Sequence, residues 1–239
     1  MYTLCLLLTL CMCSVNKEQD VRTVEEFYAE ITDNEFKVSM DFNMDLSWTS
    51  GDEISVFRTA SSNEKYRFTG NTGDYGAAIR VDGTGKLTIN NCVFDNNTGY
   101  YGTIYTNIGA TVTNSIFLNG SKQLCGDIAG AVYDISGTLF QGNTDSAITA
   151  KASDTLKVAG STFTQANKVN SNGAGIYNQG TDATISDSLF IDNLGGRGSA
   201  IRNNGTMTIS GCTFSGNISQ ALDSKNNVWD AGTVYNEGT

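Results

Sequence analysis

Aromatic and β-branched positions recur along the chain at a spacing of 23 to 27 residues. Six segments of similar pattern each end on a phenylalanine, at Phe94, Phe117, Phe140, Phe163, Phe190 and Phe214. Five residues before each phenylalanine stands Ile or Val, and two residues before it stands Ser, Thr or Cys. Self-similarity at such a period is typical of a solenoid, in which each repeat forms one coil.

A bend is predicted inside each segment, three residues before the phenylalanine. This position holds only residue types that tolerate a left-handed backbone, namely Asn91, Asn114, Gly137, Gly160, Asp187 and Gly211. A third strand is predicted upstream, from motifs such as GAAIRV (76–81), GTIYTN (102–107), GAVYDI (130–135) and GAGIYNQG (173–180). Such a repeat is too short for a strand and a long crossover helix. We therefore expect an all-β stack of about seven parallel coils, the first a degenerate one ending at Phe68, with equivalent residues about 4.8 Å apart.

An asparagine follows three residues after the phenylalanine in four coils, at Asn97, Asn143, Asn193 and Asn217. Aligned asparagine side chains in stacked coils can hydrogen-bond along the ladder and satisfy the backbone of the turn. We interpret this column as structural and not as a ligand-binding surface.

A second column is more suggestive of binding. The position after the inward Ile or Val of the upstream motif is filled by Arg80, Tyr105, Tyr133, Thr149, Tyr177, Arg202 and Tyr235. Alternation along a strand directs these side chains outward, although the shortened third coil leaves Tyr133 ambiguous. Exposed Tyr and Arg can stack on sugar rings or on a protein partner. The alternative is an aromatic ladder that only stabilises the sheet.

The pairing of G-[AST]-x-[IV] with F-x-x-N in one repeat resembles the repeats of chlamydial polymorphic outer membrane proteins and of adhesin-like surface proteins of methanogenic archaea. The resemblance covers residues 68–239, and the first motif carries mostly one glycine where those families have two. It implies a right-handed parallel β-helix that is displayed outside the cell and has an adhesive role.

The two ends of the chain differ from the repeats. Residues 1–15 are apolar and uncharged, which predicts a secretion signal, with a buried strand or helix as the alternative. Residues 16–64 form an acidic N-terminal cap in which a short helix over 24–32 is expected to cover the end of the solenoid. Residues 65–239 form the repeats, and their last segment restates an earlier motif and stops in mid-coil, so we expect a further C-terminal domain or an anchor.

Charge and composition limit the kinds of partner and cofactor that the sequence predicts. The chain has a net charge of −10 and no histidine. Residues 17–64 carry 4 basic and 12 acidic side chains, whereas residues 65–239 carry 11 and 13, so no basic stripe for nucleic acid is predicted. Three of the 6 cysteines lie in the predicted signal, and Cys92 and Cys212 belong to coils too far apart for a disulfide. We expect neither a metal nor a cofactor.

An enzymatic function is the main alternative, because parallel β-helices commonly house pectin lyases and polygalacturonases. The densest acidic group on the coils is Asp182, Asp187 and Asp192. Glycan hydrolysis would need such carboxylates in pairs. The corner position of Asp187 favours a role in turn geometry, so no residue is assigned as catalytic.

Sequons for N-glycosylation occur at Asn96, Asn119, Asn204 and Asn217. Taken together, the sequence predicts a secreted or surface-displayed, non-catalytic, adhesin-like β-helix whose lateral face binds a glycan or a cell-surface protein. A polysaccharide-active enzyme and a structural stalk are the two rivals.

Overall fold

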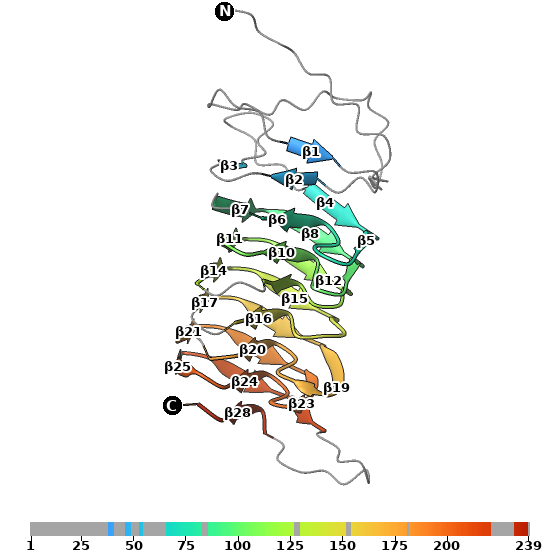
Figure 1. Cartoon of the computed structure of the whole chain (residues 1–239). Helices are drawn as coiled ribbons and strands as arrows, with labels where there is room; N and C mark the ends of the chain where they lie inside the picture. The colour runs from blue at the N-terminus through green and yellow to red at the C-terminus, as the bar shows by residue number, and fades with distance from the viewer. Residues whose placement is uncertain are drawn as a thin grey trace, which may run out of the picture.

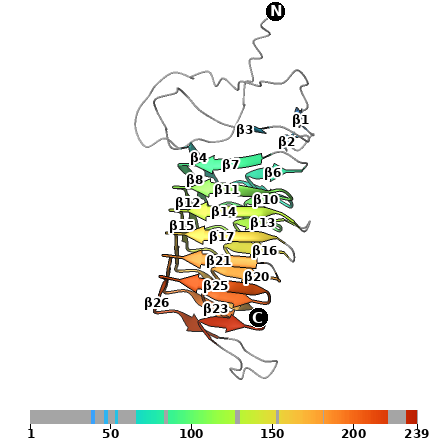
Figure 2. The same cartoon turned by 90° about the vertical axis from the view of Figure 1, so that its left-hand side faces the viewer.

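The described part of the chain is a stack of β-strand coils, seen from the side in Figure 1. The computed structural model describes residues 38–40, 46–48, 53–54, 66–82, 86–126, 130–151, 154–180, 182–220 and 232–238. Three parallel sheets of seven strands each run the length of the stack, as the view in Figure 2 also shows. Coils at both ends are incomplete, so the stack has about six turns, close to the number predicted.

Each regular coil gives one strand to each of the three sheets. Sheet 1 consists of β6 (Ile79–Val81), β10 (Ile104–Thr106), β13 (Leu124–Cys125), β16 (Ile148–Ala150), β20 (Ile176–Asn178), β24 (Ile201–Asn203) and β28 (Val234–Asn236). Sheet 2 consists of β3 (Glu53–Ile54), β7 (Lys86–Asn90), β11 (Gly109–Thr113), β14 (Val132–Ser136), β17 (Thr155–Ala159), β21 (Asp182–Ser186) and β25 (Thr206–Ser210). Sheet 3 consists of β4 (Tyr66–Thr69), β8 (Cys92–Asp95), β12 (Ile116–Leu118), β15 (Leu139–Gln141), β18 (Thr162–Thr164), β22 (Leu189–Ile191) and β26 (Thr213–Ser215).

Smaller sheets lie in the segments that lead from sheet 3 back to sheet 1. They are formed by β19 (Asn167–Asn172) with β23 (Leu194–Arg197) and β27 (Ile218–Ser219), and by β5 (Thr72–Gly73) with β9 (Thr98–Gly99). Near the N-terminus β1 (Val38–Met40) pairs antiparallel with β2 (Leu46–Trp48). These return segments form one border of the site described below.

The bend between sheet 2 and sheet 3 confirms the corner predicted from the sequence. All six predicted positions have positive φ, from 50° at Asn114 and Asp187 to 63° at Gly211. A second left-handed position follows the phenylalanine by two residues in every coil, at Gly70, Asn96, Asn119, Gly142, Gln165, Asp192 and Gly216. Because each strand is so short, one left-handed residue is enough to turn the chain onto the next face.

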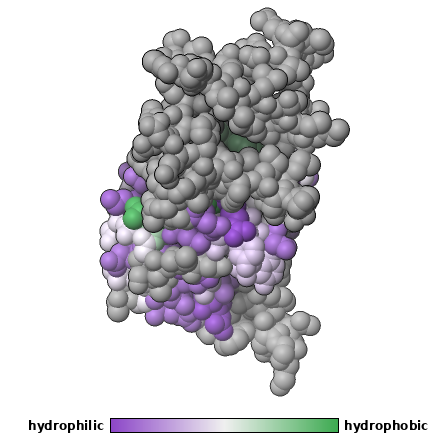
Figure 3. Space-filling model, turned by 45° about the horizontal axis from the view of Figure 1, so that its top comes forward, coloured by the Kyte–Doolittle hydropathy of each residue, from purple (hydrophilic) through white to green (hydrophobic). Residues whose placement is uncertain are grey.

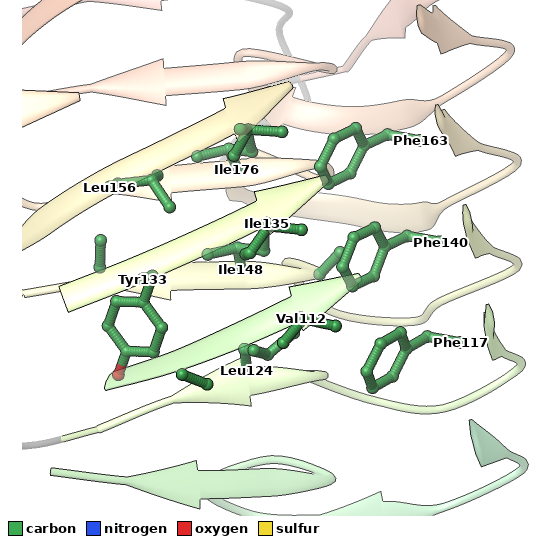
Figure 4. Packing of buried hydrophobic residues seen from close by; sticks show 14 of the residues in the cluster. Val112, Phe117, Leu124, Tyr133, Ile135, Phe140, Ile148, Leu156, Phe163 and Ile176 are labelled. Atoms are coloured by element: carbon green, nitrogen blue, oxygen red, sulfur yellow. The ribbon is translucent and has the colours of Figure 1, made fainter. Parts of the chain in front are cut away.

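The core consists of ladders of like residues. Rings from Phe68 to Phe214 form one continuous stack, with neighbouring centroids 4.6 to 5.0 Å apart and ring planes within 11° of parallel. Figure 4 shows Phe117, Phe140 and Phe163 in this stack. The Ile and Val side chains of sheets 1 and 2 fill the space beside the rings. This arrangement confirms the predicted stacking and its spacing.

Polar side chains at the corners also form ladders. In the small-residue column, the backbone N–H groups of Cys92, Thr138 and Ser161 donate to the hydroxyl of the next coil. In the asparagine column, Asn193 donates to the carbonyl of Phe163 and to Asn217 Oδ1, both at 2.9 Å. These bonds confirm the interpretation of the asparagine column as structural, since its buried amides are committed to the turns.

The N-terminal border of the solenoid differs from the predicted one. The two residues of β3 pair in parallel with β7, so sheet 2 begins before residue 65. The predicted helix over 24–32 and the predicted signal over 1–15 lie outside the described residues. None of the described segments is a helix long and apolar enough to cross a lipid bilayer.

Candidate functional site

The outer face of sheet 1 carries the column that the sequence singled out. Parallel pairing aligns Arg80, Tyr105, Cys125, Thr149, Tyr177, Arg202 and Tyr235 at equivalent positions of successive strands. Their neighbours in the strand are the inward Ile, Leu and Val residues of the core. Alternation along the strand therefore places six of the seven predicted residues in one row.

Tyr133 is the exception, and its place in the row belongs to Cys125. Tyr133 lies in β14 of sheet 2, where it pairs with Ala110 and Leu156 and is completely buried. Its hydroxyl donates to the carbonyl oxygen of Thr106 at 3.1 Å. The reason is the period of two, because Tyr133 stands two residues before the inward Ile135 and so shares its face. A buried side chain cannot contact an external ligand, which corrects the prediction of Tyr133 as a binding residue.

An aromatic cluster lies at the N-terminal end of the row. The ring of Tyr75 stacks on Tyr101 with centroids 4.2 Å apart, and the edge of Tyr105 meets Tyr75 at 5.1 Å. The guanidinium of Arg80 lies 5.0 Å from the centroid of Tyr75. Tyr105 is only 5% exposed beneath these rings, whereas Tyr100 beside them is 75% exposed. The most exposed ring of the cluster is therefore Tyr100, which comes from the return segment and not from the predicted row.

A second cluster lies at the C-terminal end. The guanidinium of Arg202 is 5.3 Å from the ring centroid of Tyr177 and 5.9 Å from that of Tyr235. Arg202 also donates to Glu237 Oε2 at 2.5 Å. This hydrogen bond and the positive charge of Arg202 lower the pKa of Glu237 below its ordinary value. The contacts hold the predicted residues Tyr177, Arg202 and Tyr235 together as one stacked group.

Between the two clusters, the row lies at the bottom of a groove with a volume of about 530 Å³. Its floor is formed where the row changes from tyrosine to the small side chains Cys125 and Thr149, both buried. Tyr101 and Tyr177 line its two ends. Figure 3 shows that the described surface on one face of the molecule is mainly hydrophilic. The groove therefore combines aromatic ends with a polar interior.

The two long borders of the groove come from the segments before and after the strands of sheet 1. Lys122, Asp145 and Lys168 line it from the return segments, and Lys151 and Gln179 line it from the turns that follow β16 and β20. Lys168 Nζ donates to Asp145 Oδ1, so this lysine and this carboxylate form an ion pair. Three ammonium groups against one carboxylate give the groove a positive charge on a negatively charged chain.

Asp154 holds the turn that carries Lys151. One carboxylate oxygen accepts the backbone N–H groups of Gly130 and Ala131 at 3.0 Å, and the other accepts that of Lys151 at 2.7 Å. Asp154 is 3% exposed, and this burial raises the pKa of its carboxyl above the ordinary 3.8 against the opposing effect of the three N–H donors. The side chain thus joins the border of the groove to the segment that leads into β14 in the coil before.

Replacing Asp154 with Asn is expected to change how stability depends on pH. A raised pKa means that the folded chain binds this proton more tightly than the unfolded chain, so the stabilisation it brings is present below pH 3.8 and is lost as pH rises through the folded pKa. Urea unfolding at pH 4 and at pH 7 gives the free energy of unfolding of wild type and of Asp154→Asn. We expect the stability of wild type relative to the variant to be greater at pH 4 than at pH 7. A difference that is constant or that grows with pH would contradict this assignment.

The predicted acidic group does not form a site. Asp182 opens β21, whereas Asp187 and Asp192 occupy the two successive left-handed corners with φ of 50° and 53°. Asp187 follows Asp182 by five positions, across β21, and Asp192 follows Asp187 by five positions, across β22, and five positions span about 16 Å in extended chain. Paired catalytic carboxylates of glycosidases lie about 5 to 9.5 Å apart. The positions agree with a role in turn geometry, and none of the three lines the groove.

The four sequons differ in what their side chains already bind. Asn96, Asn119 and Asn204 are exposed. Asn217 is partly buried, and its Nδ2 donates to the carbonyl of Phe190 at 2.8 Å as part of the asparagine ladder. A glycan on Asn217 would remove this bond from the ladder.

Sequence reasoning missed the groove residues that come from the connecting segments. Tyr100, Lys122, Lys151 and Lys168 fall outside the repeated motifs, so no column points to them. One signal was available, since Lys122, Lys151 and Lys168 come from three successive coils of an otherwise nearly neutral solenoid.

Comparisons with known proteins agree with this architecture. The family described as "Right handed beta helix region" matches residues 54–236. Its start coincides with β3, the first strand of sheet 2, and its end coincides with β28. A search of curated proteins and a search of solved structures found no match to the chain. With more than half of its length matched, the chain belongs to the right-handed β-helix family.

Proposed function

We propose that this protein is a non-catalytic binding protein that holds a glycan in the groove on the outer face of sheet 1. The observation that supports this proposal is the hollow itself, in which the small floor residues Cys125 and Thr149 lie between Tyr101 and Tyr177. Aromatic faces are good surfaces for the apolar faces of sugar rings. Amides and hydroxyls such as Asn172, Gln179 and Thr149 offer partners for sugar hydroxyls.

The non-catalytic part of the proposal rests on the carboxylates of the described residues. Asp145 is the one carboxylate that lines the groove, and it is paired with Lys168. Hydrolysis with two carboxylates would need a second acid or base within reach. The lysine and tyrosine side chains that surround the groove instead favour binding.

An adhesin-like role outside the cell is the wider form of this proposal. It is supported by the resemblance of the repeats to those of polymorphic outer membrane proteins and adhesin-like proteins, and by the apolar residues 1–15, which have the length of a signal-peptide core. A rigid stack with a binding groove along its side suits attachment to a long polymer or to a surface. A cell-surface glycan is therefore the partner that we propose.

The test is retention of the purified protein on an array of immobilised polysaccharides, with newly released chain ends scored in the same wells. We expect retention without new ends, weakened by Tyr100→Ala and by Tyr177→Ala. Leu189→Ala, which removes an exposed side chain from sheet 3, is the matched control and should bind like wild type. New ends would favour the enzyme, and no retention on any polysaccharide would favour a stalk.

A further inference from the structure

The outer face of sheet 3 differs in character from the outer faces of the other two sheets. The residues directly before and after the core phenylalanine point outward, and parallel pairing aligns them in two outer rows. On the five strands from β8 to β22, six of these ten positions are aliphatic, at Val93, Ile116, Leu118, Leu139, Leu189 and Ile191. A sheet surface that faces water is normally polar, as in sheet 2, whose exposed residues include Asp134, Lys157 and Asp182. Sheet 3 is therefore apolar on both of its faces.

The aliphatic side chains of the two outer rows reach the surface of the molecule. Leu189 is 39% exposed, and the aliphatic residues of the rows on β12 and β15 are partly exposed. Single apolar side chains are common on protein surfaces, whereas a continuous patch of them marks an interaction site. The outer rows form such a patch because successive strands place like residues side by side.

Charge distinguishes sheet 3 from the other lateral faces as well. None of its five strands from β12 to β26 contains a charged residue. The ion pair between Arg67 and Asp95 belongs to β4 and β8, at the N-terminal end of the stack. The outer row of sheet 1 contains Arg80 and Arg202, and sheet 2 carries exposed charges. Since burial of an unpaired charge is unfavourable, sheet 3 is the lateral face that can be covered at the lowest cost.

The size of this face limits how tightly a partner can bind to it. Each strand spans five positions between its two left-handed corners, which is about 16 Å, and the strands from β8 to β26 span five steps, which is about 24 Å. Two such faces in contact would cover about 800 Å² in projection, less than the roughly 1,200 to 2,000 Å² of stable interfaces. A contact between two copies of the chain would therefore be weak and would depend on protein concentration.

The order of the strands makes the face complementary to itself. The strongly aliphatic strands β12 and β22 lie at equal distances from the middle of the sheet, with β15 and β18 between them. A two-fold axis along the strands, between β15 and β18, would place β12 of each copy on β22 of the other. In this arrangement Ile116 faces Leu189, and Leu118 faces Ile191. Homo-oligomers most often have such closed two-fold symmetry, and one patch then forms two equivalent contacts.

The corners beside β12 and β22 favour the same antiparallel arrangement of the stacks. It places Asp187 and Asp192 opposite Asn114 and Asn119 of the second copy, whose side-chain amides can donate hydrogen bonds to carboxylates. If the two stacks ran in the same direction, Asp187 of one copy would instead face Asp192 of the other, and like charges repel. The antiparallel arrangement also keeps apart the N-terminal ends of the stacks, which follow a segment with 4 basic and 12 acidic side chains at residues 17–64.

From these observations we infer that the outer face of sheet 3 is a self-association surface, through which two copies of the chain form a weak dimer with antiparallel stacks and with β12 on β22. Two sheets that pack face to face lie about 10 Å apart, so that the side chains of their outer rows interdigitate. The inference goes beyond the proposed function, because the groove lies on sheet 1 and outside this contact.

Sedimentation velocity of the full chain over a range from about 1 µM to about 1 mM tests the inference. We expect a monomer at the lowest concentrations and a dimer whose share grows with concentration. No larger species is expected, because a two-fold contact between two identical faces is closed.

Two charged variants locate the contact. Ile116→Lys and Leu189→Glu each place an unpaired charge against an aliphatic side chain of the other copy, so each alone should weaken the dimer at least about tenfold. A mixture of the two variants should restore dimerisation, because the new lysine of one copy then faces the new glutamate of the other. Val132→Glu adds a carboxylate to an exposed position of sheet 2 and is the matched control. Melting temperatures close to that of wild type show that the variants remain folded.

Three results would overturn the inference. A chain that stays monomeric over the whole range would leave the outer rows with the role of stabilising the sheet or of binding a different protein. Dimerisation that neither charged variant weakens would place the contact on another face. A mixture of the two variants that remains monomeric would exclude the antiparallel pairing of β12 with β22.

None of these results bears on the groove of sheet 1. A weak dimer is dissociated at the low concentrations of a retention assay, so Leu189→Ala remains a valid control for glycan binding. Failure of the glycan array would likewise leave the self-association of sheet 3 untouched.

Discussion

Replacing Phe140 with Asp is expected to abolish the cooperative thermal unfolding of the solenoid. The ring is 1% exposed and stacks between Phe117 and Phe163 at 4.9 and 4.8 Å. Removal of a buried phenylalanine costs about 3 to 5 kcal/mol, and an unpaired carboxylate in the same place costs more. The sum is comparable to the whole stability of a domain, which is about 5 to 15 kcal/mol.

The measurement is thermal unfolding followed by circular dichroism, together with two further variants. Val132→Asp places the same carboxylate at an exposed position of the same coil and should leave the transition nearly unchanged. Phe140→Leu keeps the site apolar and should lower stability by an intermediate amount. A transition near that of wild type for Phe140→Asp would mean that the phenylalanine stack is not essential to the fold.

A substitution in the asparagine ladder is expected to have the second large effect on stability. Asn193→Leu removes the donor to Phe163 O and to Asn217 Oδ1, and also the acceptor of the Ala166 N–H at 3.1 Å. Each buried polar group left without a partner costs about 1 to 3 kcal/mol, so we expect a loss of about 3 kcal/mol or more. Urea unfolding measures this loss.

Asn167→Leu is the control for the ladder variant. Asn167 is exposed, and it contributes its backbone N–H to Asn143, a bond that the substitution leaves in place. The same chemical change should therefore alter stability by less than about 0.5 kcal/mol. Similar losses for the two variants would show that the ladder adds little beyond the packing of the coil.

The repeated part of the fold was predictable because equivalent residues stack directly on one another. The six corner positions, for example, have the same backbone conformation in six successive coils, and all six show positive φ. The third coil departs from the repeat, because its strand in sheet 1 is only Leu124–Cys125 and lacks the glycine motif. The motif GAVYDI was therefore assigned to sheet 1 although most of it forms β14 of sheet 2.

The groove was less predictable for a physical reason. Lys122 and Lys168 come from return segments whose length and conformation change from coil to coil. Their positions depend on how each segment folds back, and no periodicity expresses that. The row of sheet 1 was predicted because it follows the strand period, whereas the residues that border it follow no period.

The exceptions to the ladders bear on how the chain finds its correct alignment during folding. A shift of one part of the stack by a whole coil would still place phenylalanine on phenylalanine. The regular columns alone therefore do not distinguish neighbouring coils. Tyr133 and Gln123 do, because the hydroxyl of Tyr133 reaches Thr106 O and Gln123 Nε2 reaches Asn143 Oδ1 only in the native order. These two side chains distinguish the third coil from its neighbours and so disfavour a stack that is shifted by one coil.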